Sequence, residues 1–139
     1  MRAVLDPNVL VAALISPGGP PRAIVVAWTE DRFELIGSPA LLGELRDVLS
    51  RPKFRRWVSS DTATAFIDGL QDDATTVDDP QPRPSISPDP DDDYLLALAL
   101  AARADCLVSG DRHLTSLVDA RPPVLTPRQF LEQLDDPGG

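Results

Sequence analysis

Residues 89–114 read DPDDDYLLALALAARADCLVSGDRHL, and this stretch carries most of the information about the fold. Residues 94–103 are hydrophobic all round, which is typical of a helix buried between other elements. Residues 106–108 form a short apolar run that predicts a central strand of a parallel sheet. The acidic run Asp91, Asp92 and Asp93 precedes the helix, and Asp111 follows the strand. A buried helix leading directly into a buried strand indicates a parallel α/β fold.

The rest of the chain continues this alternation of strands and helices. Residues 3–5 predict a strand ending at Asp6, and the next helix has Pro7 in its first turn, where a missing N–H donor costs nothing. Further strands are predicted at residues 33–36, 75–77 and 124–125, and further helices at 22–31, 39–51, 60–70, 112–118 and 127–134. Right-handed crossovers between such strands predict one α/β domain, with a parallel sheet of four to five strands flanked by helices in three layers.

Local signals mark several helix ends and one long loop. Ser38 and Pro39 read as an N-cap and first helical residue, and Ser60 or Asp61 as the cap of a later helix. Thr126, Pro127 and Gln129 predict a capping box at the start of the last helix. Residues 79–90 are rich in proline and predict a crossing loop without helix or sheet.

The composition is that of a globular domain with an acidic excess. The chain has 139 residues, 42% of them hydrophobic, with 15 prolines gathered in a few loops. Neither a signal peptide nor a membrane-spanning run is predicted, so we expect a cytoplasmic protein without a membrane partner. The single cysteine, Cys106, is predicted to be a buried, inert thiol. The net charge of −9 counts against a general nucleic-acid-binding surface, unless a bound metal ion reverses the sign locally.

Four acidic residues near predicted turns form the candidate site. Asp6 and Asp111 each follow the carboxyl end of a predicted strand, and Asp93 begins the apolar helix. Glu44 lies more than a turn inside its helix, at the edge of an apolar stripe, and can lean toward the same rim. Because these turns gather at one edge of a parallel sheet, the four carboxylates can converge on one cation. Two polar side chains there could orient a ligand or a water, Asn8 and Ser109.

Such a cluster favours a hard divalent cation, although each acid also has a plainer interpretation. Oxygen ligands favour Mg²⁺ or Mn²⁺ over zinc, because the single histidine and single cysteine form no paired ligand motif. Asp93 and Asp111 would otherwise simply cap helices. Glu44 would be a solvated helix residue, and Asp6 would belong to an ordinary turn. Spacing alone leaves both interpretations open.

Four segments of the chain resemble, in this order, the PIN-domain ribonucleases. They are VLDPNVLVAAL at residues 4–14, SPALLGELRDVLSRPKF at 38–54, the stretch at 89–114 quoted above, and TPRQFL at 126–131. Within that family the resemblance is to the VapC-like toxins of toxin-antitoxin systems. It spans nearly the whole chain, so we assign residues 1–134 to a PIN-like nuclease domain and residues 135–139 to a frayed tail.

The resemblance implies a set of site residues. Asp6, Glu44, Asp93 and Asp111 would bind Mg²⁺ or Mn²⁺ and serve catalysis, supported by three neighbouring polar residues, Asn8, Ser109 and Asp92. The register within residues 91–93 is open by one or two positions, and Asp93 is preferred because it directly precedes the apolar helix. Many relatives have Thr or Ser in place of Pro7, so a role for that side chain near the metal is lost or passes to Asn8.

The resemblance also implies a reaction and partners. The reaction would be metal-assisted hydrolysis of RNA, leaving 5′-phosphate and 3′-hydroxyl ends, with Asp111 or Asp93 removing a proton from water. The number of ions, one or two, stays open. The implied partners are the RNA substrate, a small antitoxin protein and a second copy of the chain in a homodimer.

One basic and aromatic stretch could contact RNA. Lys53, Arg55 and Arg56 could hold the backbone while Phe54 or Trp57 stacks on a base. The alternative is a solvated helix face with both aromatic rings in the core.

Two other functions compete with the nuclease. A PIN-shaped binding module with weak catalysis could act through a protein or RNA partner. A receiver-type phospho-acceptor domain would need a partner lysine late in the chain, whereas the only lysine is Lys53.

Overall fold

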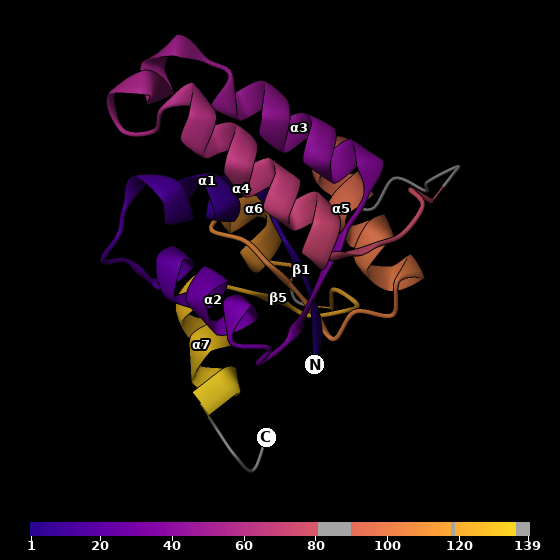
Figure 1. The fold of residues 1–139 in the computed structure, drawn as a ribbon. Helices are drawn as coiled ribbons and strands as arrows, with labels where there is room; N and C mark the ends of the chain where they lie inside the picture. The colour runs from indigo at the N-terminus through magenta and orange to yellow at the C-terminus, as the bar shows by residue number, and fades with distance from the viewer. Residues whose placement is uncertain (81–89, 118, 136–139) are drawn as a thin grey trace.

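The computed structural model describes residues 1–80, 90–117 and 119–135, with the backbone alone at residues 90–93. In these ranges the strands are β1 (Arg2–Leu5), β2 (Glu34–Gly37), β3 (Thr75–Thr76), β4 (Cys106–Val108) and β5 (Val124–Leu125). The helices are α1 (Pro7–Ile15), α2 (Pro20–Thr29), α3 (Pro39–Leu49), the 3-10 helix η1 (Pro52–Arg56), α4 (Ser60–Asp73), α5 (Pro90–Ala101), α6 (Arg112–Thr115) and α7 (Pro127–Asp135). Figure 1 shows their arrangement.

The described strands form one parallel sheet in the order β3-β2-β1-β4-β5. β1 is central, and Val4 lies opposite Ile36 of β2 and Leu107 of β4. These three side chains are buried, as expected for strands that are covered on both faces. The prediction of a three-layer α/β fold with four to five parallel strands is therefore confirmed.

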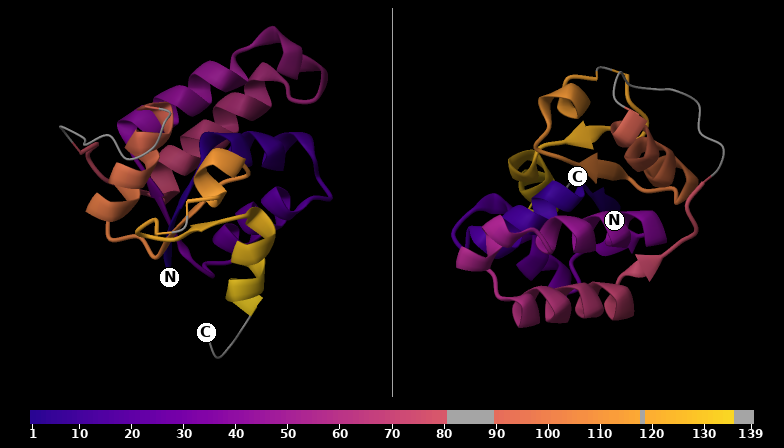
Figure 2. Two further views of the ribbon diagram at one scale, coloured as in Figure 1. Left: turned by 180° about the vertical axis from the view of Figure 1, so that it is seen from behind. Right: turned by 90° about the horizontal axis from the view of Figure 1, so that it is seen from above.

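Helices cover both faces of the sheet. α5 packs on β1 and β4, whereas α1 contacts α2 and α3, and α3 contacts α4. Figure 2 shows α5 on one side of the strands and the group from α1 to α4 on the other. α7 packs on α2 and β5, and its Phe130 ring meets Phe33 edge-on at a centroid distance of 5.0 Å.

Two of the predicted caps are confirmed and one is shifted. The Ser38 hydroxyl accepts a hydrogen bond from the Leu41 amide at 3.2 Å. The Thr126 amide donates to the Gln129 side chain at 2.9 Å, and the Gln129 amide donates to the Thr126 hydroxyl at 3.1 Å, which is the predicted capping box. α4 is capped by Ser59, not by Ser60 or Asp61, because the Ser59 residue is extended and its hydroxyl accepts from the Thr62 amide.

Helix α5 differs from its prediction at both ends. It begins at Pro90, four residues before Tyr94, so residues 91–93 lie inside its first turns, where acidic residues complement the helix dipole. Leu100 is 61% exposed, so the helix is not buried on every side. It ends before Arg103, whose left-handed conformation (φ 55°) lets the Ala104 amide donate to the Ala99 carbonyl.

Smaller differences concern α2, α6 and the ends of the predicted loops. α2 spans Pro20–Thr29 instead of residues 22–31, because a proline can occupy its first turn. α6 ends at Thr115 instead of residue 118. Of the proline-rich loop predicted at 79–90, residues 81–89 lie outside the described residues, as do residues 136–139 of the predicted tail. The loop ends one residue earlier than predicted, because Pro90 already belongs to α5. In the described ranges no single helix is long and apolar enough to cross a membrane, and only the pair α1 and α2, bent by 99°, passes the same test together.

Cys106 is buried in β4, as predicted from its sequence context. Burial raises the pKa of its thiol to about 12, and the charge of the neighbouring Asp105 adds to the effect. The thiolate, which is the reactive form, is therefore disfavoured at neutral pH. We assign no chemistry to this residue.

Candidate functional site

The pairing of β1 with β4 brings the first two site residues together. Leu5 lies opposite Val108, so the residues that follow them, Asp6 and Ser109, leave the sheet side by side at its carboxyl rim. The Asp6 amide donates to the Val108 carbonyl at 2.9 Å and extends the ladder by one bond. The Ser109 hydroxyl donates to Asp6 Oδ2 at 2.9 Å. The parallel register therefore places a buried carboxylate and a buried hydroxyl at the end of the two inner strands.

Asp6 is a buried acid that also begins a helix. Its side chain is only 5% exposed, and its Oδ1 accepts from the Asn8 amide at 3.0 Å as the N-cap of α1. Burial raises the pKa of the Asp6 carboxyl, and the negative charge of Asp111 raises it further, while the bonds from Asn8 and Ser109 oppose the shift. The ionised form of Asp6 is thus costly unless a cation relieves it.

Asp111 reaches the same place through Ser109. Its amide donates to the Ser109 hydroxyl at 3.0 Å, and its Oδ1 accepts from the His113 amide at 2.9 Å as the N-cap of α6. The residue is half-buried. Asp111 is therefore a helix cap, as the plainer interpretation holds, and its charge is also felt by Asp6. Its role as a helix cap does not prevent Asp111 from also being a metal ligand.

Glu44 approaches the site from α3. The helix buries Leu41, Leu45 and Val48 and leaves Glu44 half-buried beside this stripe. The hydroxyl of Tyr94 on α5 donates to Glu44 Oε2 at 2.6 Å. Burial, followed by the Glu44 bond and the charges of Glu44, Asp6 and Asp79, raises the pKa of Tyr94 above its usual range. The charges of three carboxylates from separate parts of the chain therefore act on this hydroxyl.

Asp79 is a neighbour of the site that the sequence interpretation missed. Its Oδ2 accepts from the Ala40 amide at 2.9 Å, which caps the first turn of α3 from 39 residues away. Its Oδ1 is buried and has no hydrogen-bond partner among the residues that the structure describes. No signal in the sequence predicts this contact, because Asp79 follows an edge strand and precedes Pro80 like an ordinary turn residue.

The acidic run before α5 is only partly described. The backbone of Asp91, Asp92 and Asp93 lies in the first turns of the helix, and Asp93 immediately precedes Tyr94. The side chains of all three lie outside the described residues. The predicted third ligand, and the choice among these residues, therefore stay predictions.

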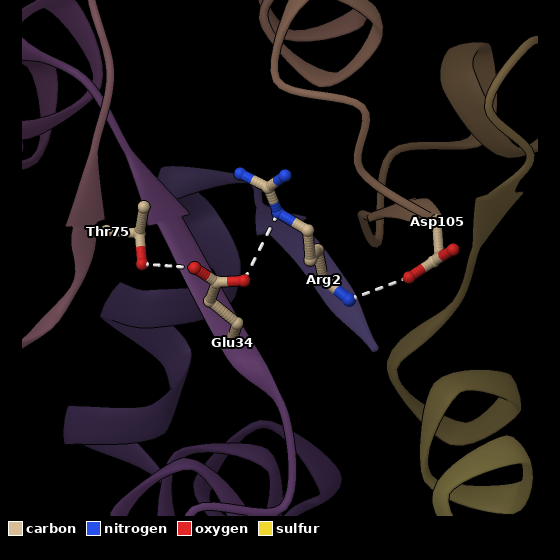
Figure 3. Close-up of polar contacts among 4 residues, drawn as sticks. All are labelled: Arg2, Glu34, Thr75 and Asp105. Carbon is tan, nitrogen blue, oxygen red and sulfur yellow. Dashed lines mark hydrogen bonds and ion pairs between the residues drawn. The ribbon is translucent and has the colours of Figure 1, made fainter.

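The acids of this rim share one electrostatic property. The described ion pairs are Arg2 with Glu34, Arg32 with Asp135 and Arg51 with Asp47, so none of them involves the carboxylates of the rim. The opposite end of the sheet is different, as Figure 3 shows. There Glu34 is held by Arg2 and by the Thr75 hydroxyl, and Asp105 accepts from the Arg2 amide at 2.7 Å. Among the described residues, Asp6, Glu44 and Asp111 thus have no cationic partner.

The candidate ligands are of the kind that a hard divalent cation prefers. Only some of their side chains are among the described residues. All candidate donors are oxygens, which suits Mg²⁺ or Mn²⁺. Burial, and to a smaller extent the charge of Asp111, raises the pKa of Asp6, so a nearby cation would favour its ionised form. Among described residues, however, no three His, Cys, Asp or Glu side chains form a group that could hold a metal ion.

A pocket of about 420 Å³ opens beside Asp111. Besides Asp111, residues from three helices and the loop before α6 line it, among them Asn8, Ala12, Pro21, Gly110 and Pro127. Asn8 is exposed, so its amide can meet a ligand that enters the pocket. The predicted supporting residue Asn8 thus lies at an open surface, whereas Ser109 lies beneath it.

The predicted basic contacts divide into two kinds. The Arg55 guanidinium donates to the Leu49 carbonyl and, at 2.8 Å, to the Val58 carbonyl, so it ties the end of α3 to the start of the next loop. Lys53 lies over the Phe54 ring, and Arg56 lies over the ring of Trp57, which is 53% exposed. The Trp57 ring therefore lies outside the hydrophobic core, whereas the partly buried Phe54 ring packs against the core.

The fold and the rim define a parallel α/β domain that gathers unpaired carboxylates at the carboxyl ends of its inner strands. Residues 2–113 match the PIN domain family, and the chain belongs to this family. The chain is 26% identical over 144 residues to the uncharacterized protein MJ1680 of Methanocaldococcus jannaschii, covering 97% of this chain and 92% of that protein. Membership of the PIN domain family supports a nuclease.

Two solved structures share the fold. VapBC2 from Rickettsia felis, bound to a DNA fragment from their promoter, superposes with a TM-score of 0.64 at 14% identity, covering 91% of this chain and 98% of that chain. PAE2754 from Pyrobaculum aerophilum superposes with a TM-score of 0.57 at 16% identity, covering 96% and 88%. The PIN-like fold expected from the sequence is thereby confirmed.

Proposed function

We propose that the protein is an endoribonuclease that depends on Mg²⁺ or Mn²⁺ and acts in the cytoplasm as the toxin of a toxin-antitoxin pair. The observation that carries the proposal is the pair Asp6 and Asp111, joined through Ser109 at the carboxyl rim of a PIN sheet. Glu44 is held on α3 by Tyr94, and none of the three acids is paired with a cation in the described residues. A cluster of this kind repels itself and becomes favourable when a cation is present.

The residues of the rim would have separate roles in metal binding, proton transfer and substrate entry. Asp6, Glu44, Asp111 and an acid from residues 91–93, for which we keep Asp93 with Asp92 in support, would hold the ion. When bound, the ion supplies Lewis-acid stabilisation of a phosphodiester and lowers the pKa of a water molecule. Asp111 or Asp93 would accept the proton of the attacking water. The pocket beside Asp111 would admit the substrate, with the amide of Asn8 at its mouth.

The exposed basic residues would contact the RNA outside the reaction centre. Lys53 and Arg56 are exposed and each lies over an aromatic ring, so they could neutralise phosphates while the exposed Trp57 stacks on a base. Arg55 is committed to two backbone carbonyls and would support the position of this surface.

The toxin role rests on the family and on one neighbour. VapBC2 shares the fold, and its name describes a two-component complex. A small antitoxin protein would then bind this chain, and a homodimer would be the assembled form. Co-expression with the gene that adjoins its own, followed by purification of a complex, tests this part of the proposal independently of cleavage.

Cleavage of a mixed RNA pool tests the enzymatic proposal. The wild-type protein should cleave after addition of Mn²⁺ or Mg²⁺ and stop in EDTA, leaving 5′-phosphate and 3′-hydroxyl ends. Asp6→Asn should be inactive, whereas Asp105→Asn, which changes an acid at the opposite end of the sheet, should be active. Binding of RNA without metal-dependent cleavage would instead favour the PIN-shaped binding module.

A further inference from the structure

The contact between Tyr94 and Glu44 joins two helices that lie far apart in sequence. The hydroxyl donates to Glu44 Oε2 at 2.6 Å, a short distance for a bond to a carboxylate, and 50 residues separate the two positions. Tyr94 lies directly after the acidic run at 91–93, and Glu44 lies in the middle of α3. The bond therefore connects the helix that begins with those acids to the helix that supplies Glu44.

The two partners differ in how firmly they are held. The Tyr94 side chain is 8% exposed and belongs to the hydrophobic core, so packing fixes its ring and the direction of its hydroxyl. A half-buried glutamate has several rotamers, and ordering it costs conformational entropy. A fixed donor at 2.6 Å selects the rotamers that keep the Glu44 carboxylate at the rim.

The start of α3 is held in the same region. Asp79 accepts from the Ala40 amide, and its charge acts on the Tyr94 hydroxyl together with those of Glu44 and Asp6. The hydroxyl bonds one carboxylate directly and feels the charges of two others. It is a neutral donor, so it can hold a carboxylate without replacing a cation. An arginine in its place would neutralise the cluster and compete with a metal ion.

We propose that Tyr94 is a positioning residue of the site, whose hydroxyl holds the Glu44 carboxylate in an orientation ready to bind a divalent ion. This inference rests on the proposed function and assigns a role to a residue outside the acidic set. Outer partners that orient metal-binding carboxylates commonly contribute ten-fold or more to metal affinity.

Tyr94→Phe tests the inference because it removes only the hydroxyl and keeps the buried ring. Mn²⁺ binding to the full-length chain would be measured by electron paramagnetic resonance and calorimetry, and thermal unfolding would be followed in EDTA. We expect the Mn²⁺ dissociation constant to rise about ten-fold. We also expect cleavage to recover toward the wild-type rate at saturating Mn²⁺, with a melting temperature in EDTA within about 2 °C of wild type.

The chain offers a matched control at the other end of the sheet. The Thr75 hydroxyl donates to Glu34 Oε2, also at 2.6 Å, and Figure 3 shows that this contact joins two neighbouring strands. Thr75→Val removes the same type of bond and should leave Mn²⁺ affinity unchanged. In a Glu44→Gln background, Tyr94→Phe should cause no further loss of Mn²⁺ affinity, because the carboxylate that it positions is gone.

The outcomes separate this inference from the proposed function. If wild type binds Mn²⁺ and cleaves RNA while Tyr94→Phe behaves identically, the inference is overturned and the nuclease stands. A lowered melting temperature with unchanged Mn²⁺ affinity would also overturn it, since Tyr94 would then only tie α5 to α3. A wild-type protein that neither binds Mn²⁺ nor cleaves RNA would overturn both.

Discussion

Asp6 and Ser109 are joined by a hydrogen bond between two neighbouring inner strands, although 103 positions separate them in the sequence. The serine hydroxyl donates to the Asp6 carboxylate and accepts from the Asp111 amide. One buried hydroxyl therefore uses its donor and an acceptor site to hold Asp6 and the backbone of Asp111.

Ser109→Ala should destabilise the protein and disorder the pair of acids. The change leaves the buried Asp6 carboxylate with one partner fewer, and removal of a partner from a buried polar group costs about 1–3 kcal/mol. Urea unfolding in EDTA measures this loss. Ser116→Ala is the control, because that hydroxyl is exposed and contacts the His113 carbonyl at 3.4 Å. Equal stability of the two variants would contradict the role assigned to Ser109.

Asp6→Asn should abolish cleavage while leaving the metal-free protein as stable as wild type, or more stable, at pH 7. Burial raises the pKa of Asp6 in the folded state above its ordinary value of 3.8, so its ionisation opposes folding. Below pH 3.8 the carboxyl is protonated in both states and exerts no penalty. As pH rises through the folded pKa, wild type loses stability relative to the variant.

The measurement is the difference in unfolding free energy between wild type and Asp6→Asn in EDTA, from pH 7 down to about 4. The advantage of the variant should shrink as the pH falls. Asp105→Asn corrects for the removal of one charge from an acidic chain. If wild type were instead more stable than Asp6→Asn at pH 7 and lost this advantage as the pH fell, the ionised Asp6 carboxylate would stabilise the fold.

Arg55→Gln should lower the stability of the protein, whereas Arg56→Gln should weaken its binding to RNA. Arg55 binds two backbone carbonyls, so its loss should lower the unfolding free energy by about 1–3 kcal/mol. Arg56 is exposed over Trp57, so its loss should leave stability unchanged, weaken RNA binding and reduce the salt dependence of binding by about one ion. Chemical denaturation and RNA binding at several salt concentrations distinguish the two, and interchangeable effects would refute the division.

Cys106 should resist alkylation in the folded protein. Its thiol is buried in β4 and its pKa is raised to about 12, so iodoacetamide at pH 8 should modify it only after denaturation. Mass spectrometry with and without urea checks this. Rapid modification of the native protein at the rate of a free thiol would mean that β4 opens readily.

Local patterns predicted the strands, the crossovers and several caps because each depends on neighbours within a few residues. The Ser38 cap and the Thr126 capping box need only a hydroxyl and an amide three residues apart. The rim followed from topology, since Asp6 and Asp111 follow strands that lie side by side. These parts of the site were therefore accessible from the sequence.

Other contacts depend on distances that sequence does not contain. The bonds from Tyr94 to Glu44 and from Ala40 to Asp79 join residues 50 and 39 positions apart, and each partner resembles an ordinary core or turn residue. The start of α5 was misplaced because a helix dipole stabilises acids in a first turn, so an acidic run need not precede a helix. Arg55 looked like its basic neighbours until its carbonyl partners were seen.

The register between β1 and β4 determines which polar side chains meet at the rim. Leu5 opposite Val108 sets the positions of the polar residues that follow. A one-residue insertion in β1 that slipped this alignment would turn every later side chain of the strand to the other face, carrying Asp6 away from Ser109. Changes of length in a four-residue strand are therefore an efficient way to silence the protein without altering any acid.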